Sequence, residues 1–407
     1  MTTTLSDVPE EFRSDFDIAL DPELLQAPQN RMTEVFIDDP RDIVFTPHNG
    51  GHWIISNFEY GREILRDQHA FGSFPVGVPA NFEQRPRLIP LESGPDEHSR
   101  YRRLLLPVFE PRTISMMSDK IRHRTAQVMD TVLVDQEVDF LWAVAKPIPT
   151  GVFLDMMGLP QNMQEKFFEW ENGFYRAPEL DDRMVYGQKI SQSLVACVED
   201  HIANPKEDIV GLLLKVEVEG ERLTPDEVNA ICYLLFLAAV DTVATMLGFI
   251  TRYLAEHQEL FFSLKDDPAL LPKAVDELIR MQAFINLNRI CEQDMEFHGV
   301  QFRKGDNIVI PSFVMDRDAR SFKEPHIFNP DRPKQEISMH HAFGDGPHKC
   351  IGMHLAKLEI NIVLEEFIKR VKAFEISDHS KVTAHGGTTM GLDSLPLKLS
   401  LDDEFIK

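Results

Sequence analysis

The segment that most constrains the fold of this chain is residues 231–250, ICYLLFLAAVDTVATMLGFI. Sixteen of its 20 residues are apolar, which is enough for a helix that spans a lipid bilayer. Asp241 lies near the middle, where it would cost roughly 3 kcal/mol in a bilayer, and no excess of Lys or Arg fixes a topology. A helix that is apolar on all sides is also what the centre of a large globular protein requires. We therefore expect a buried central helix and not a membrane span.

The rest of the chain is mainly helical in pattern. Apolar residues recur with the helical period at 97–106, 113–133, 163–170, 184–203, 225–257, 270–281 and 350–371. Alternating stretches predict β-structure at 294–310 and a hairpin at 43–55, which contains an Asn-Gly-Gly turn signal. Residues 1–45 contain Asp-Pro and Ala-Pro steps, and we expect an extended segment that wraps around the body. No repeat or flexible linker divides the chain, so the sequence predicts one mainly α domain with minor β structure over residues 1–407.

The charge balance excludes several classes of partner. The chain has 42 Lys and Arg against 66 Asp and Glu, a net charge of −24, which repels nucleic acid and anionic lipid. Its four cysteines form no CxxC pair, which indicates a reducing compartment and not a disulfide framework. The first 20 residues are acidic and lack the basic and apolar parts of a signal peptide. We expect a cytoplasmic protein that binds neither nucleic acid nor membrane.

The segment HHAFGDGPHKCIGMHLAKLEI carries the most chemical information. Cys350 follows a glycine-containing loop and precedes a helical pattern, so we expect it at a helix N-terminus, where a thiolate and metal binding are favoured. A buried structural cysteine is the ordinary alternative. The glycine spacing lacks the complete G-x-G-x-x-G of a dinucleotide loop. Zinc is a further alternative, because His340, His341, His348 and His354 are near, although one cysteine among scattered histidines is weak evidence.

The pattern FGDGPHKCIG resembles the haem-binding signature FxxGx(H/R)xCxG of the cytochrome P-450 family. The resemblance implies that haem b (iron protoporphyrin IX) is the cofactor and that Cys350 is its metal ligand. It implies that His348 pairs with a haem propionate, and Phe343, Gly346 and Gly352 match the remaining fixed positions. It also implies the P-450 fold, a triangular and mostly helical prism around a buried haem.

Two further segments fit the same family. In DELIRM, Glu277 and Arg280 are three residues apart on one helical face, which by itself is ordinary surface decoration. The resemblance implies a structural ion-pair network that Arg332, in HIFNPDRP, completes. In DEHSRYRRLL, His98 and Arg102 are one turn apart, which by itself fits a solvated basic face. The family pattern implies that His98 and Arg102 bind haem, with Arg289 as a further propionate partner.

The central helix contains LAAVDTVATM, which is similar to the oxygen-binding stretch of the family. Burying Asp241 and Thr242 without partners would cost about 1–3 kcal/mol each, so they need partners or a function. The structural alternative is that Thr242 bonds back to the carbonyl of Ala238 and that Asp241 caps a local kink. The resemblance implies that Asp241 and Thr242 are catalytic and relay protons, and Ala238 and Ala239 leave room for a diatomic ligand.

The resemblance is strongest to soluble bacterial camphor-hydroxylase-like members. It implies a monooxygenase that inserts one oxygen atom from O₂ into a C–H bond of a small hydrophobic substrate. Haem would perform the difficult chemistry, and the resemblance implies that the electrons come from a two-iron, two-sulfur ferredoxin with an NAD(P)H-dependent ferredoxin reductase. The alternatives are a peroxygenase that uses H₂O₂ and a non-catalytic haem-binding sensor or carrier.

An ungapped count from the camphor hydroxylases gives an expectation for the substrate. Pro86 falls where they carry a hydrogen-bonding tyrosine, and Gly77 falls at a nearby aromatic position. With Leu88, Leu237, Phe284 and Ile285, these positions predict an apolar and enlarged pocket. A terpenoid or norisoprenoid such as an ionone is therefore expected to bind more tightly than camphor. The alternative is that these loop positions do not line the pocket, because loops vary among relatives.

Overall fold

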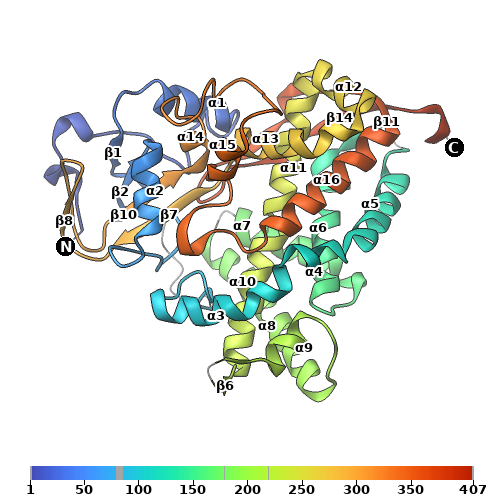
Figure 1. Ribbon diagram of the computed structural model, residues 1–407, viewed down its shortest axis with the longest axis horizontal. Helices are drawn as coiled ribbons and strands as arrows, with labels where there is room; N and C mark the ends of the chain where they lie inside the picture. Colours follow the sequence, from blue (N-terminus) through green and yellow to red (C-terminus); the bar gives the residue numbers. More distant parts are fainter. Residues whose placement is uncertain (1, 79–85, 135, 178, 219, 406–407) are drawn as a thin grey trace.

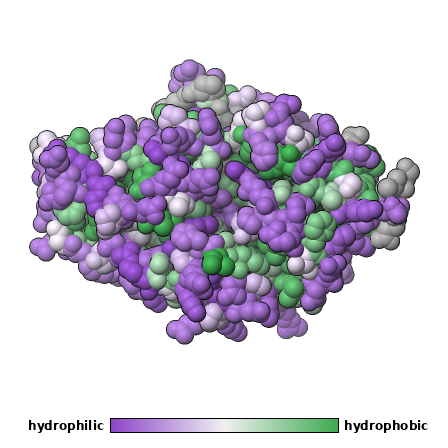
Figure 2. Space-filling model, turned by 90° about the horizontal axis from the view of Figure 1, so that it is seen from above, coloured by the Kyte–Doolittle hydropathy of each residue, from purple (hydrophilic) through white to green (hydrophobic). Residues whose placement is uncertain are grey.

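A computed structural model describes residues 2–78, 86–134, 136–177, 179–218 and 220–405. Helices fill most of the body; the strands β1, β2, β7 and β10 lie toward the side that carries the N-terminus, and β11 and β14 lie near the C-terminus (Figure 1). The predicted class, mainly α with minor β, is confirmed. That residues 1–407 form one domain stays a prediction. Hydrophilic side chains cover most of the face in Figure 2, and the apolar ones form scattered patches.

The central segment is two helices in sequence, α10 (Pro225–Val240) and α11 (Thr242–Glu256), separated at Asp241. Thr224 caps α10 in a reciprocal capping box with Glu227, since its side chain accepts from the Glu227 N–H. By length and composition the segment could cross a membrane, but 72% of its most apolar window is buried inside the protein. It packs against α6 (Pro147–Met156), α8 (Leu180–Ala203) and α16 (Met353–Arg370). The expectation of a buried central helix is therefore met, and the break lies at Asp241, where the structural alternative placed a local kink.

The helix that follows Cys350 is α16, and it begins at Met353 with Gly352 as its N-cap, three residues later than predicted. It packs against α5 (Ser118–Val132), α13 (Leu271–Met281) and α11. These contacts hold α16 beside the central segment, as Figure 1 shows for α16 and α11.

The largest sheet has five strands in the order β1–β2–β10–β7–β3. They are β1 (Ile43–Thr46), β2 (His52–Ile55), β10 (Asn307–Pro311), β7 (Asn286–Cys291) and β3 (Phe71–Gly72). The predicted hairpin at 43–55 is confirmed, with Ile43 opposite Ile55. Its turn has positive φ at Asn49, Gly50 and Gly51, which explains the Asn-Gly-Gly sequence. The predicted β region at 294–310 is also confirmed as β8 (Met295–Phe297), β9 (Val300–Phe302) and β10.

The remaining elements complete the body around this centre. The helices are α1 (Pro28–Met32), α2 (Phe58–Arg66), α3 (Pro95–Phe109), α4 (Pro111–Ser115), α7 (Gln164–Arg176), α9 (Ile209–Lys215), α12 (Gln258–Asp266), α14 (Ser312–Met315) and α15 (Lys334–Met339). The strands are β4 (Glu137–Asp139), β5 (Glu217–Val218), β6 (Glu221–Arg222), β11 (Val371–Ile376), β12 (Thr383–His385), β13 (Gly391–Ser394) and β14 (Pro396–Leu401). The predicted helix at 113–133 is two helices, because α4 ends at Ser115 before α5 begins.

The N-terminal segment differs from the extended form that was predicted. It contains short 3-10 turns and α1, which starts with Pro28 at a position where the fixed φ of proline favours a helix. The segment nevertheless lies along the body. The Thr3 N–H and hydroxyl each donate to the buried Asp306 carboxylate over 2.7 Å, and this ties the start of the chain to the turn before β10.

Candidate active site

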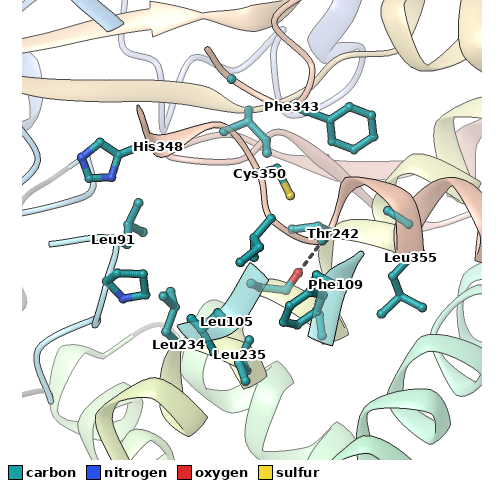
Figure 3. Close-up of a pocket in the computed structure, with 18 of the residues that line it drawn as sticks. Leu91, Leu105, Phe109, Leu234, Leu235, Thr242, Phe343, His348, Cys350 and Leu355 are labelled. Atoms are coloured by element: carbon teal, nitrogen blue, oxygen red, sulfur yellow. Dashed lines mark hydrogen bonds between the residues drawn. The ribbon is translucent and has the colours of Figure 1, made fainter. Parts of the chain in front are cut away.

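A cavity of about 360 Å³ lies between the central segment, α3, β7 and the loop before α16. Cys350 and Thr242 both line it, and Figure 3 shows the Cys350 sulfur facing a space bordered by aliphatic side chains. The wall comes from elements far apart in the sequence, including Leu105 of α3, Leu235 of α10 and Leu355 of α16. The fold therefore brings one thiol and one hydroxyl into a common apolar space.

Cys350 differs from the other three cysteines in its solvent exposure. Cys197, Cys232 and Cys291 are buried, whereas Cys350 is exposed and its accessible surface faces the cavity. Surrounding protein atoms desolvate the thiol and raise its pKa, against the backbone N–H groups of Gly352 and Met353 and the Arg102 cation, which lower it. The protein alone therefore does not favour a free thiolate, in contrast to the helix-end expectation. A bound metal cation would deprotonate the thiol outright.

The loop before Cys350 explains why glycine occupies its fixed positions. Gly344 and Gly346 have φ of 69° and 68°, a region that other residues rarely adopt. A Cβ at Gly346 would lie 2.5 Å from the backbone oxygen of Leu65 on α2, so a larger residue would push the loop away. The Cys350 N–H donates to the Phe343 carbonyl over 2.8 Å and closes the loop. The local sequence thus fixes where the sulfur lies.

A cluster of basic side chains borders the same cavity: His98, Arg102, Arg289 and His348. The rings of His98 and His348 lie 4.0 Å apart, centroid to centroid. Burial, together with the Arg102 and Arg289 cations, lowers the pKa of His98 to about 4, and burial with the same neighbours lowers the pKa of His348 to about 2. Both imidazoles are therefore neutral near pH 7, and only the two arginines are charged.

The two arginines of this cluster lack a carboxylate partner among the described residues. Arg289 is 4% exposed, its Nε has no hydrogen-bond partner in that part of the chain, and burial lowers its pKa to about 10. Arg102 donates to the Lys349 carbonyl, and neither arginine has an ion pair in the described ranges. Buried guanidinium groups are normally paired, so an anionic group is missing from the protein's own atoms. A large apolar molecule with anionic substituents and a thiolate-binding metal, as in haem b with its two propionates, fits this set of residues.

Glu277, Arg280 and Arg332 form the predicted ion-pair network. Arg280 Nη2 lies 2.7 Å and Arg332 Nε lies 3.0 Å from Glu277 Oε1, and all three side chains are almost fully buried. The arginines also donate to carbonyl oxygens of Asp316, Pro325 and Lys323. The network lies outside the cavity lining, and it fixes the segment that leads to the Cys350 loop. Removing one partner of such a buried network is costly, because it leaves an uncompensated charge inside the protein.

The break in the central segment places two polar residues next to each other. The Thr242 hydroxyl donates to the Ala238 carbonyl over 2.7 Å, so the local bond that was the structural alternative is present. Ala238, Ala239 and Thr242 all line the cavity. Asp241 is 4% exposed, and it stands between the two helices. Because the one Thr242 proton is used by the Ala238 carbonyl, the lone pairs of its oxygen can accept from a molecule in the cavity.

The predicted pocket residues divide into two groups. Phe284 and Ile285 line the cavity, whereas Gly77, Pro86, Leu88 and Leu237 are not among its lining residues. Leu88 packs into a core cluster on the α8 side of the molecule and Leu237 packs against it, and the Gly77 N–H donates to Asn288. The structural alternative for the two loop positions, that they lie outside the pocket wall, matches this arrangement.

Sequence reasoning missed several wall residues. On the central segment they are Ile231, Leu234, Leu235, Val243 and Met246, which share the helical face of Ala238 and Thr242. Counting by three and four from Thr242 would have found this face and rejected Leu237. Further missed residues come from loops and β7 and carry no periodic signal, among them Val76, Ile89, Leu91, Asn286, Asn288 and Thr388.

Glu359 was also missed. It lines the cavity from α16, it is 3% exposed, and its Oε2 has no hydrogen-bond partner in the described part of the chain. Burial raises the pKa of this carboxyl to about 8, so it is mostly protonated near neutral pH. Its signal in the sequence is a lone acid between apolar residues of one helix.

The zinc alternative lacks a ligand set in the part of the chain that the structure describes. No three His, Cys, Asp or Glu side chains in these ranges come close enough together to hold a metal ion. The His340 and His341 side chains instead lie 4.0 and 3.6 Å from Asp316.

Comparisons with known proteins agree with this geometry. A sequence profile described as Cytochrome P-450 matches residues 174–401. The probable cytochrome P-450 127A1 of Sinorhizobium fredii is 32% identical over 372 residues, covering 88% of this chain and 87% of that protein. Cytochrome P-450(MEG) of Priestia megaterium is 30% identical, covering 86% and 89%.

The solved structure of CYP101C1 superposes with a TM-score of 0.90 at 27% identity, covering 98% of this chain and 100% of that one. CYP101J2 gives a TM-score of 0.88 at 28% identity with the same coverage. The fold predicted from the resemblance is thereby confirmed. The chain belongs to the cytochrome P-450 family of haem-thiolate monooxygenases.

Proposed function

We propose that this enzyme inserts one oxygen atom from O₂ into a C–H bond of a small terpenoid or norisoprenoid, with Cys350 as the thiolate ligand of haem iron. The observation that carries the proposal is the shared cavity, which holds the only exposed cysteine of the described chain, two uncompensated arginines and the Thr242 hydroxyl. When bound, haem supplies the oxidising chemistry. The protein residues hold it, exclude water and deliver protons.

The residues that hold the cofactor act by charge and by shape. Arg102 and Arg289 would neutralise the propionates, and the neutral rings of His98 and His348 can donate hydrogen bonds to them. Gly346 lets the Cys350 loop lie close to α2, Gly352 leaves space beside the Cys350 sulfur, and Phe343 lines the cavity beside the sulfur. The network of Glu277, Arg280 and Arg332 supports this loop from behind.

Thr242 and Asp241 are the proposed proton relay. The bond to Ala238 orients the Thr242 hydroxyl, so its oxygen can accept a hydrogen bond inside the cavity and hold a proton donor in place there. Asp241 is the ionisable group that stands next to it at the helix break. This pair supports a reaction with O₂ over direct use of H₂O₂, because protons are needed when O₂ is the oxidant.

The wall supports an apolar substrate. Leu234, Leu235, Met246, Phe284 and Ile285 present aliphatic or aromatic surface, and burying such surface drives binding of apolar ligands. The deciding experiment titrates the haem-loaded protein with β-ionone and with camphor and follows the Soret shift to high spin. Tighter binding and a larger shift with the ionone support the norisoprenoid. Full high-spin conversion by tightly bound camphor would contradict it, and no shift with any terpenoid would favour a non-catalytic haem carrier.

The electrons are proposed to come from a ferredoxin and its NAD(P)H-dependent reductase in the cytoplasm. From the sequence, a basic patch made of Arg100, Arg103 and Lys349 is the expected docking site.

In the structure, Arg100 of this patch pairs with Glu227 of α10 at 3.2 Å. The exposed surface near α3 and α4 includes Arg103 and Arg112, with Leu106 and Met116 exposed beside them. An acidic ferredoxin would be steered to this surface, so turnover should fall with Arg112→Glu and with added salt. Turnover that ignores both changes would place the docking site elsewhere.

A further inference from the structure

Three consecutive backbone N–H groups at one edge of the cavity are held by side chains and not by a strand. Val76 donates to Glu92 Oε1 over 3.0 Å, Gly77 donates to Asn288 Oδ1 over 3.1 Å, and Val78 donates to Thr388 Oγ1 over 3.0 Å. The three acceptors come from different parts of the chain, namely the loop before α3, strand β7 and the loop between β12 and β13. Residues 76–78 therefore take their position from side chains that converge on them.

Glu92 has a second bond that joins this segment to another part of the wall. Its Oε2 accepts the Leu88 N–H over 2.9 Å, so one carboxylate binds backbone N–H groups at both Val76 and Leu88. Glu92 is 2% exposed, and bonds from N–H groups to a buried carboxylate are stronger than neutral ones. Its own N–H donates back to the Leu88 carbonyl over 2.8 Å, which closes a tight turn.

The residues held in this way belong to the cavity wall. Val76 lines the cavity next to the first bond, and Ile89, Pro90 and Leu91 line it next to the second. Two of the three acceptors, Asn288 and Thr388, line it as well. A shift of the Glu92 carboxylate would move two pieces of apolar wall at once, because both are bonded to it.

We propose that Glu92 is a positioning residue that sets the distance between Val76 and the 89–91 segment, and thereby the shape of substrate that the cavity accepts. The inference rests on the proposed function, in which this cavity holds the substrate. The proposed role requires a carboxylate at position 92, because the Val76 and Leu88 N–H groups each donate to a different oxygen of Glu92. A glutamine has almost the same shape but presents one acceptor and one NH₂ donor, so one of the two backbone N–H groups would face another donor.

The test compares Glu92→Gln with Glu97→Gln in the haem-loaded protein. Glu97 is a matched control, because it loses the same charge nearby, where it pairs with Arg87 on the surface. Hydrogen exchange at the Val76 and Leu88 amides reports the bonds themselves, and Soret titration with β-ionone and camphor reports the cavity. We expect Glu92→Gln to raise exchange at one or both amides by about tenfold and to change the ratio of the two dissociation constants by about tenfold. Glu97→Gln should change neither quantity.

The two readouts separate the possible failures. A wild-type protein that gives no Soret shift with either ligand would refute the proposed function. The exchange data would still measure the Glu92 clamp, meaning the two bonds from the Val76 and Leu88 N–H groups to the Glu92 carboxylate. Faster exchange at Val76 or Leu88 with an unchanged ratio of dissociation constants would overturn the inference, as would equal effects of the two variants.

Thr388→Val is a second variant for the case in which Glu92→Gln does not fold. It keeps the shape of the side chain and removes only the acceptor for Val78. We expect faster exchange at Val78, unchanged exchange at Leu88 and an altered ratio of the two dissociation constants. An unchanged ratio would again contradict the idea that these side-chain bonds set the shape of the cavity.

Discussion

The Thr242 hydroxyl lies 2.7 Å from the carbonyl oxygen of Ala238, one turn earlier on the central segment. The bond uses the only proton of the hydroxyl, so toward the cavity this side chain is a hydrogen-bond acceptor of fixed orientation. The role of Thr242 can therefore be tested by removing the oxygen without opening a large space.

Thr242→Ala should keep substrate binding and NADH consumption but lower the product formed per NADH by about tenfold, with the balance appearing as peroxide. The hydroxyl is needed for protonation and not for binding, which is why the two effects separate. Thr242→Ser is the matched control and should retain most of the coupling, because it keeps the oxygen. Product and peroxide per NADH are measured together, and equal coupling in Thr242→Ala and wild type would remove Thr242 from the relay.

Cys350→Ala should abolish the red-shifted Soret band of the reduced carbon monoxide complex. Cys350 is the described cysteine whose surface faces the cavity, and thiolate ligation produces that band. Cys291→Ala is the control, since Cys291 is buried in β7 and its thiol donates to the Gln293 carbonyl over 3.0 Å. An unchanged spectrum in Cys350→Ala would disprove the ligand assignment.

Arg289→Met should have opposite effects on the two forms of the protein. Without haem, Arg289 is a buried cation with no ion pair in the described ranges, so its removal should stabilise the apoprotein by about 1–3 kcal/mol. With haem, the variant loses a propionate partner and should release the cofactor faster. Thermal unfolding of both forms and haem transfer to apomyoglobin measure these effects. Lys273→Met, which removes an exposed pair with Asp331, should change neither form by more than about 0.5 kcal/mol.

Glu359 predicts a pH dependence of stability. Burial raises the pKa of its carboxyl from 4.5 to about 8, so the folded protein keeps the proton at pH values where the unfolded chain has lost it. The contribution of Glu359 to the free energy of unfolding is complete below pH 4.5 and is lost as the pH rises toward 8 and beyond. The side chain of Glu359→Gln does not titrate, so the variant does not lose this contribution as the pH rises. Its free energy of unfolding relative to wild type should therefore rise between pH 4.5 and about 8, by about 1.4 kcal/mol per pH unit and by a few kcal/mol at most.

Urea unfolding of the haem-loaded proteins at several pH values between 5 and 9 would measure the difference. Glu365→Gln on the same helix is the control, because Glu365 pairs with Arg122 at the surface. A constant difference between Glu359→Gln and wild type at all pH values would mean that Glu359 is ionised throughout the range.

The parts of this molecule that the sequence predicts are those with a local signature. The glycines before Cys350 have to be glycines because of their φ values and the approach of Leu65, and the apolar run at 231–250 has to be buried. The helical repeat of apolar residues does not mark the helix break at Asp241, because the apolar pattern continues through it. Leu237, Gly77 and Pro86 are not among the residues that line the cavity, because Leu237 is one step away in helical phase and an ungapped count cannot follow a loop. Their part in substrate binding stays a prediction.

The hydrogen bonds of the Glu92 clamp could not be predicted from any local sequence pattern. Its bonds connect the loop before α3 with residues 76 and 88, and its companions Asn288 and Thr388 are more than 190 residues further along the chain. Nothing in the neighbourhood of each residue marks it as an acceptor for residues 76–78. Such contacts follow only from the assembled fold.

The cluster of basic groups around the cavity has a consequence for the life of the protein in a cell. The buried Arg289 and the half-buried Arg102, neither with an ion pair in the described chain, make the empty protein more prone to open, and open chains are the ones that proteases cleave. Cofactor binding removes this penalty and favours the closed form in proportion to free haem and its affinity. We therefore expect the abundance of this enzyme to follow haem supply through turnover of unloaded chains.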